Sequence, residues 1–76
     1  MRYFRDEIII RKLGSNIKSI RTKKGLSQEE LSYKSELDIS QIGRIERGQV
    51  NTSVSILNKI SIALEVELKE LFDFGE

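Results

Sequence analysis

Apolar residues recur at three- and four-residue steps over residues 6–24, and charged residues largely fill the positions between them. This is the period of an amphipathic helix. The apolar series consists of Ile9, Ile10, Leu13, Ile17 and Ile20. Asp6 is expected to cap the helix, and Gly25 to end it after a lysine-rich last turn. Gly14 interrupts the pattern, so either the helix starts near Leu13 or another helix packs closely at the glycine; one long helix is favoured.

Two helix-start signals follow, eleven residues apart. Each is a pair in which the first side chain can accept a hydrogen bond from the backbone N–H three residues on, while the second returns to the N–H of the first. The two pairs are Ser27 with Glu30 and Asp38 with Gln41. They predict helices over 28–34 and 39–47. The short connection between them is typical of helices that cross steeply in a DNA-binding helix-turn-helix, which we assign to 28–47.

Two more helices are expected after the loop that starts at Gly48. Thr52 or Ser53 should cap a helix over 54–64, whose apolar side chains are expected to be nearly all in the core. These side chains are Val54, Leu57, Ile60, Ile62, Ala63 and Leu64. Glu65 stands where glycine or asparagine would close a helix more easily. The apolar residues of 66–74 then predict a short fifth helix.

The elements together predict an all-α fold, a compact five-helix bundle formed by one domain over 1–76. Residues 1–12 are an N-terminal extension of the first helix, and 66–76 form a C-terminal helix and tail. The short apolar run 8–10 could instead be a strand, but it has no second strand to pair with. A chain of 76 residues lies near the lower size limit for a stable domain.

Composition excludes several classes of protein. The chain has no Cys and no His, which argues against a disulfide framework, a structural zinc site and a catalytic centre, and we expect no cofactor and no enzymatic activity. It has neither a basic-then-apolar leader nor an apolar run of about 18 residues, so we expect a cytoplasmic protein without membrane contact. The net charge is only +1, but 11 of the 13 basic residues lie in 1–48 and 5 of the 12 acidic ones in 49–76.

The order of these parts resembles the Cro/CI-type (XRE-like) helix-turn-helix family of bacterial and phage regulators. Three segments carry the resemblance without insertion between them: LGSNIKSIRTKKGLSQEELS, IGRIERG and NTSVSILNKISIALEVELKELF. The resemblance covers about 13–72 and implies a lambda-repressor-like DNA-binding fold. It also implies that Gln28 braces the third helix and that Arg21 forms an ion pair with Glu46.

The resemblance further implies that the third helix enters the major groove of double-stranded DNA. Four residues of its N-terminal half are the candidates to contact bases: Ile39, Ser40, Gln41 and Arg44. Arg44 can hold guanine with two donors, whereas a serine discriminates weakly. The expected phosphate contacts are Arg21, Gln28, Lys34, Arg47, Asn51, Thr52 and Ser53. The chain departs from the family at Gly43, where a small polar residue is usual, and at Thr52, which often is proline.

The function implied is sequence-specific binding of a (pseudo)palindromic operator by a homodimer, with repression of transcription as the favoured outcome. The expected dimer interface is formed by tail residues that exceed what the core can bury: Leu68, Leu71, Phe72 and Phe74. In the alternative interpretation, Phe72 and Phe74 fold back on the monomer. Other possible functions are an antitoxin or a restriction-system controller of the same fold, or an interaction module that docks an unidentified protein through LKELFDFGE and binds no DNA.

Overall fold

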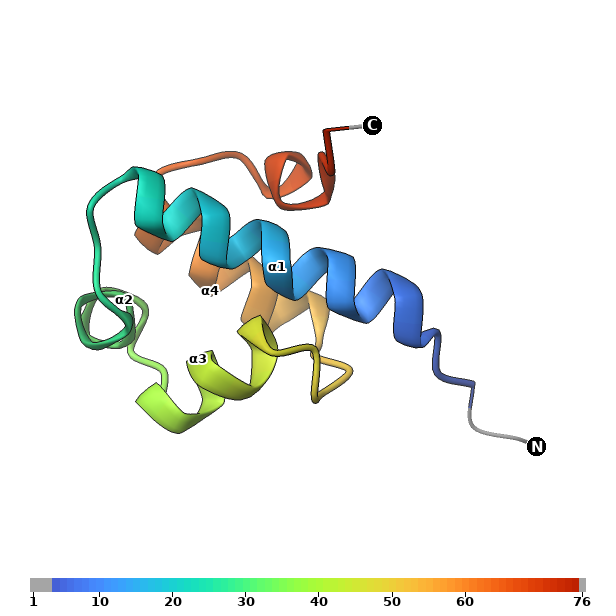
Figure 1. The fold of residues 1–76 in the computed structure, drawn as a ribbon. Helices are drawn as coiled ribbons and strands as arrows, with labels where there is room; N and C mark the ends of the chain where they lie inside the picture. Colours follow the sequence, from blue (N-terminus) through green and yellow to red (C-terminus); the bar gives the residue numbers. More distant parts are fainter. Residues whose placement is uncertain (1–3, 76) are drawn as a thin grey trace.

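The computed structural model describes residues 4–75 and shows four α-helices followed by a short 3-10 helix (Figure 1). The elements are α1 (Glu7–Lys23), α2 (Gln28–Ser35), α3 (Ile39–Glu46), α4 (Val54–Leu64) and η1 (Leu68–Phe72). The all-α prediction is confirmed over the described part of the chain. The predicted fifth helix over 66–74 is shorter and is a 3-10 helix. Residues 1–3 of the expected extension and residue 76 of the tail lie outside the described residues.

Side-chain caps fix the starts of the first two helices as predicted. The Asp6 carboxylate accepts from the backbone N–H groups of Ile8 and Ile9. In the Ser27–Glu30 capping box, the Ser27 hydroxyl accepts from the Glu30 N–H at 3.0 Å, and the Glu30 carboxylate accepts from the Ser27 N–H at 2.8 Å. The hydrogen bonds donated by the Ser27 backbone and side chain lower the pKa of Glu30 below its ordinary value.

The second predicted capping box, at the start of α3, is wrong. The Asp38 side chain makes no capping hydrogen bond. Its backbone carbonyl instead accepts from the N–H groups of Gln41 and Ile42, at 3.0 and 3.1 Å. Because Asp38 is exposed, water can solvate its carboxylate and the open N–H groups of the first turn. The Gln41 amide is therefore not held by a return contact to the cap.

Gly14 allows α1 and α3 to approach closely, which confirms the prediction of one long first helix packed at this glycine. A Cβ atom at position 14 would lie 2.1 Å from the Ile45 carbonyl oxygen and 2.9 Å from that of Glu46. The end of α3 therefore rests directly on the backbone of α1. Any side chain at this position would force the two helices apart.

The core is aliphatic and draws on every element of the structure. Its buried cluster consists of Ile17, Leu31, Leu37, Ile42, Ile45, Leu57, Ile60, Leu64 and Leu71. The expectation that α4 is nearly all core is wrong for two residues, since Val54 and Ile62 are 69% and 67% exposed. A helix at the surface of a small domain buries only one of its sides, and the buried side of α4 packs against α2 and η1. Among residues 4–75, no helix has the length and apolar character needed to cross a membrane.

The C-terminal segment is fastened to α1 by an amide that the sequence did not single out. The side-chain nitrogen of Asn16 donates to the carbonyl oxygens of Glu70 and Leu71, at 3.0 and 2.7 Å. Leu71 is fully buried, so it is a core residue and not available for the dimer interface predicted from the sequence.

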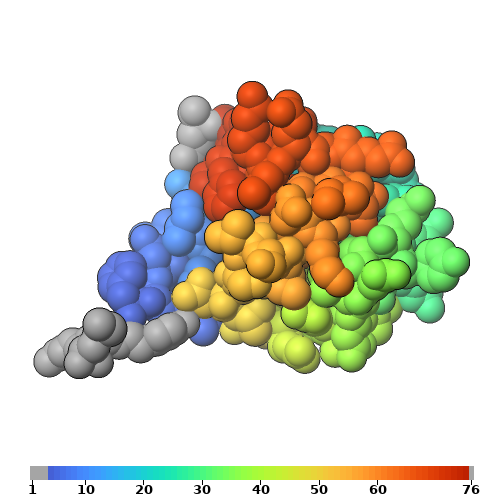
Figure 2. Space-filling model, turned by 180° about the vertical axis from the view of Figure 1, so that it is seen from behind, coloured from blue at the N-terminus to red at the C-terminus, as the bar shows by residue number. Residues whose placement is uncertain are grey.

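The outer side of the C-terminal segment is continuous with the surface of α4 when the molecule is viewed from behind (Figure 2). Phe72 remains 44% exposed, whereas the Phe74 ring is partly buried, with the Lys12 ammonium 5.9 Å from its centre.

Candidate nucleic-acid interface

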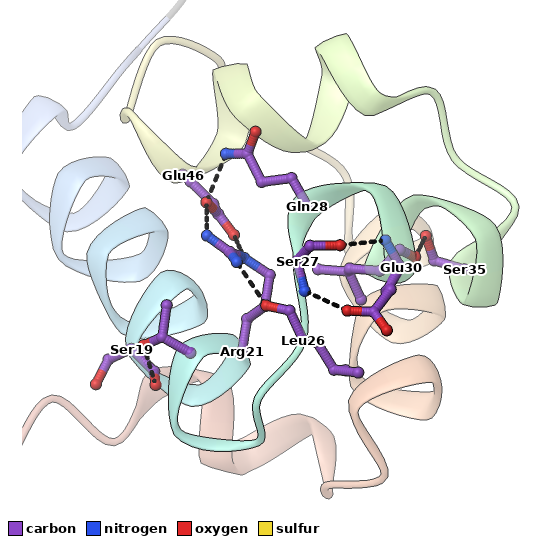
Figure 3. Close-up of polar contacts among 10 residues, drawn as sticks. Ser19, Arg21, Leu26, Ser27, Gln28, Glu30, Ser35 and Glu46 are labelled. Atoms are coloured by element: carbon purple, nitrogen blue, oxygen red, sulfur yellow. Dashed lines mark hydrogen bonds and ion pairs between the residues drawn. The ribbon is translucent and has the colours of Figure 1, made fainter.

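An ion pair between α1 and α3 sets the position of the third helix (Figure 3). The Arg21 guanidinium donates to both oxygens of the Glu46 carboxylate, at 2.7 Å from Nε and 3.0 Å from Nη2. Both side chains are buried, with 8% and 2% of their surfaces exposed. The planar fork of arginine matches a carboxylate on two parallel donors, so this contact fixes orientation as well as distance. The predicted Arg21–Glu46 pair is therefore confirmed.

Two further contacts complete this buried network. The third donor of Arg21, Nη1, lies 2.7 Å from the Leu26 carbonyl oxygen in the connection between α1 and α2. The Gln28 amide, at the start of α2, donates to Glu46 at 2.9 Å. The predicted bracing of the third helix by Gln28 is thus confirmed. The structure places the Arg21 guanidinium behind the surface, facing protein atoms, so it supports α3 from within the protein.

The exposed side of α3 carries the residues that the sequence nominated for base contacts. Ser40 and Arg44 lie one turn apart on the exposed side of the helix, opposite the buried side chains of Ile42 and Ile45. Ile39 is 41% exposed at the first position of the helix, and Gln41 is partly buried. The structure therefore leaves the side chains of Ser40 and Arg44 exposed to solvent. This is the geometry of a helix that can be inserted into a groove by its outer face.

Gly43 provides space for an arginine, a relation that sequence reasoning missed. A Cβ atom at position 43 would lie 2.8 Å from Nη1 of Arg47, so the Arg47 side chain folds back across α3 over the glycine. Its Nε also donates to the Gln49 side chain at 3.4 Å. Neither Arg44 nor Arg47 forms an ion pair with a carboxylate within the described residues. Arg44 and Arg47 consequently leave the exposed side of α3 positively charged toward its C-terminal end, while the exposed Asp38 precedes its first turn.

Most of the other predicted phosphate contacts lie in or after the loop that joins α3 to α4. Asn51 is exposed in the loop between α3 and α4, beside the partly buried Thr52. Lys34 is exposed near the end of α2, where it lines a shallow hollow with Leu26 and the end of α4, so the structure does not group it with that loop. The Ser53 hydroxyl caps α4 by accepting from the Ile56 N–H at 3.1 Å. The start of α4 therefore presents ordered N–H groups and a hydroxyl at the same edge as the loop, an arrangement suited to an anion.

Comparison with known proteins identifies the family. Residues 17–71 match the family described as Helix-turn-helix. Over 62 residues, 80% of this chain, the sequence is 45% identical to the HTH-type transcriptional regulator SlrR of Bacillus subtilis (strain 168). The match spans only 41% of SlrR, less than half the length of that relative.

Two solved structures share the fold at substantial identity. The restriction-modification controller protein C.AhdI from Aeromonas hydrophila has a TM-score of 0.81 and 46% identity, over 83% of this chain and 96% of that one. The C.Esp1396I controller tetramer, in complex with its natural 35 base-pair operator, has a TM-score of 0.83 and 38% identity over 90% of each chain. The chain therefore belongs to the helix-turn-helix family, among the Cro/CI-type regulators that its sequence resembles.

Proposed function

We propose that this protein is a sequence-specific, double-stranded DNA-binding transcriptional regulator that places α3 in the major groove. The observation that carries the proposal is a rigidly braced α3 whose exposed side presents Arg44 and Arg47 without a carboxylate partner in the described residues. Buried contacts from Arg21 and Gln28 hold Glu46 at the end of the helix, so its outer face is preorganised for contact with DNA. Rigid presentation lowers the ordering cost of binding and so favours affinity.

The exposed residues of α3 divide into different roles at the bases. Arg44 is proposed to donate to O6 and N7 of guanine, which gives about 1 to 3 kcal/mol of discrimination against other bases. Ile39 is suited to a thymine methyl group, and Ser40 to a single hydrogen bond with a base edge. Gln41 has an amide that no capping contact occupies, so it is available for adenine.

The surrounding residues are proposed to fix the position of the protein on the DNA backbone. Phosphate contacts position a protein but carry little sequence information. The proposed contacts are Gln28, Lys34, Arg47, Asn51, Thr52 and Ser53, with Arg21 acting through Glu46. A homodimer with two-fold symmetry would place two copies of α3 on successive turns of a (pseudo)palindromic operator. Repression is the proposed outcome, and it requires that the operator overlap the promoter of the regulated gene.

Control of a restriction-modification system is a more specific candidate for the biological role. The observation that favours it is the similarity to C.AhdI and C.Esp1396I over nearly the whole length of those controller proteins. The distinction rests on the genes beside the binding site. Mapping sites on the source genome would support this role if they lie at promoters of an endonuclease or methyltransferase gene, and would contradict it if they lie elsewhere.

Selection of bound duplexes from a random DNA pool tests the proposed function. We expect a symmetric site to emerge, and Arg44→Ala to weaken binding to that site by about 1 to 3 kcal/mol while binding to random DNA changes little. Equal losses on both kinds of DNA would show that Arg44 does not read a base. Failure to recover any preferred sequence, together with affinity that is insensitive to salt, would refute DNA-binding regulation and favour a protein-interaction module.

A further inference from the structure

The loop after α3 is pressed against the N-terminal half of α1. Gly48 has a φ of +70°, and a Cβ atom there would lie 2.7 Å from Cγ and 3.0 Å from Cα of Arg11. Figure 1 and Figure 2 both show the loop lying beside the early turns of α1. The side chain of Arg11 therefore emerges next to the segment that begins with Arg47. Two elements far apart in the sequence meet at one edge of the α3 surface.

The arginines at this edge have no carboxylate partner, whereas Glu7, one turn before Arg11 on α1, is paired with Arg5 at 2.7 Å. Arg11 is exposed and forms no ion pair with a carboxylate in the described part of the chain, and the same holds for Arg44 and Arg47. By contrast, the buried guanidinium of Arg21, further along α1, is fully paired with Glu46. An arginine without a carboxylate beside a proposed phosphate-binding loop is suited to a phosphate, because its planar fork matches phosphate oxygens.

We infer that Arg11 is a further contact to the phosphate backbone of DNA, which extends the binding surface from the helix-turn-helix onto the N-terminal half of α1. The inference rests on the proposed function. Direct contact between α1 and the loop at Gly48 means that DNA bound along the loop also passes the base of the exposed Arg11 side chain, which brings its guanidinium within reach of the backbone. The contact adds affinity at every sequence and does not select bases. It was absent from the set predicted from the sequence, since only the fold brings Arg11 to Gly48.

Arg11→Gln is a well-matched variant for testing this inference. Glutamine keeps Cβ and Cγ, the side-chain atoms that contact the loop at Gly48, and removes only the guanidinium. Arg11→Lys keeps a positive charge at the same place. Lys69→Gln provides a control for the loss of one positive charge, because Lys69 is exposed on η1, on the other side of α1 from α3 (Figure 1).

The measurement is the salt dependence of binding to a duplex of random sequence. Each phosphate contact contributes about 0.9 to the slope of log K against log salt, so Arg11→Gln should lower the magnitude of the slope by about that amount per protomer. Arg11→Lys and Lys69→Gln should keep the wild-type slope. A wild-type slope for Arg11→Gln, or an equal decrease for Lys69→Gln, would overturn the inference. If wild-type protein binds no DNA, the proposed function fails as well, which separates the two outcomes.

A scan with methylphosphonates, which remove the charge of one phosphate at a time, gives a second and independent measurement. It compares the wild-type protein with Arg11→Gln on a duplex recovered from the random pool. One or more substitutions should weaken the wild type but leave Arg11→Gln unaffected, because that variant has already lost the contact. If every methylphosphonate affects the two proteins equally, Arg11 does not contact phosphate.

Discussion

Gly14 and Gly43 both lie inside helices, but they have different neighbours: backbone at Gly14 and the end of a flexible side chain at Gly43. Glycine within a helix costs about 1 kcal/mol relative to alanine. At Gly14 the space for a Cβ is occupied by backbone of α3, at 2.1 Å, which cannot move without displacing the helix. At Gly43 the nearest atom is the guanidinium end of Arg47, which can swing away. Whether replacing glycine by alanine raises or lowers stability therefore depends on whether the neighbouring atoms belong to rigid backbone or to a flexible side chain.

We predict that Gly14→Ala lowers the free energy of unfolding by about 1 to 3 kcal/mol, because overpacking at the α1–α3 contact outweighs the gain in helix propensity. Gly43→Ala serves as the matched control and should raise stability by up to about 1 kcal/mol. Urea denaturation of the wild type and both variants measures the differences. If Gly14→Ala proved as stable as the wild type, the close approach of α3 to Gly14 would be incorrect.

The sequence predicted which residues of α3 are exposed, because the spacing of its apolar residues determines which side of the helix is buried. Ser40 and Arg44 fall on the exposed side of α3 because Ile42 and Ile45 determine the buried side. The position of Arg11 beside Gly48 was not predictable, since it depends on how α1 crosses the loop. The left-handed conformation of Glu36, with a φ of +60°, was also missed, because its residue type gives no signal for that conformation.

At the level of elements, capping pairs predicted helix boundaries better than they predicted the contacts themselves. Both pairs mark true helix starts, yet only Ser27 and Glu30 form the reciprocal hydrogen bonds. An exposed Asp38 can be satisfied equally well by water, so residue type alone does not decide the contact. Helix starts and ends were therefore predicted to within a residue or two, whereas the 3-10 geometry of η1 was not, because its apolar pattern also fits one short α-helical turn.

The Ser27–Glu30 capping box should make the stability of the protein depend on pH. Hydrogen bonds from Ser27 hold the pKa of Glu30 below its ordinary value, so the folded state favours the carboxylate. The resulting stabilisation is present above the ordinary pKa of glutamate and disappears as the pH falls through the lowered folded-state pKa. Glu30→Gln removes the charge but keeps an acceptor. Its stability deficit should be visible at neutral pH and vanish in acid, as measured by thermal unfolding; a deficit independent of pH would contradict this assignment.

The buried ion pair predicts a strong coupling between two elements. Arg21→Ala leaves the Glu46 carboxylate buried with only the Gln28 amide, and Glu46→Ala leaves a buried guanidinium without its carboxylate. Each single variant should lose about 3 to 5 kcal/mol of stability. The double variant should lose far less than the sum, since neither charge is left alone. Chemical denaturation of all four proteins gives the coupling, and additive losses would mean that the pair contributes nothing.

At the level of the whole molecule, the tail differs most from its prediction. The sequence suggested that its apolar side chains exceed what a small core can hold, and assigned them together to a dimer interface. In the structure Leu71 completes the core, and Asn16 fastens the adjoining carbonyl groups to α1. Apolar composition does not reveal which side of a short segment faces inward. Only Phe72 retains a large exposed surface among the four predicted interface residues.

This placement refines how dimerisation is tested. Phe72 is 44% exposed and adjoins the core through Leu71, so we predict that Phe72→Asp dissociates the homodimer without unfolding the monomer. Phe4→Asp is the matched control, because Phe4 is 79% exposed at the opposite end of the sequence. Sedimentation should give a monomer only for Phe72→Asp, with melting temperatures close to wild type for both.

Loss of the dimer should also weaken binding to the selected site more than binding to random DNA. One copy of α3 reads only a few base pairs, whereas two copies about 34 Å apart read both half-sites. The Phe72→Asp protein should therefore bind an isolated half-site as well as the wild-type monomer does and lose only the gain from joining two half-sites. If Phe72→Asp still sediments as a dimer, the interface lies elsewhere, and the exposed surface of α4 at Ile62 becomes the next place to introduce a charge.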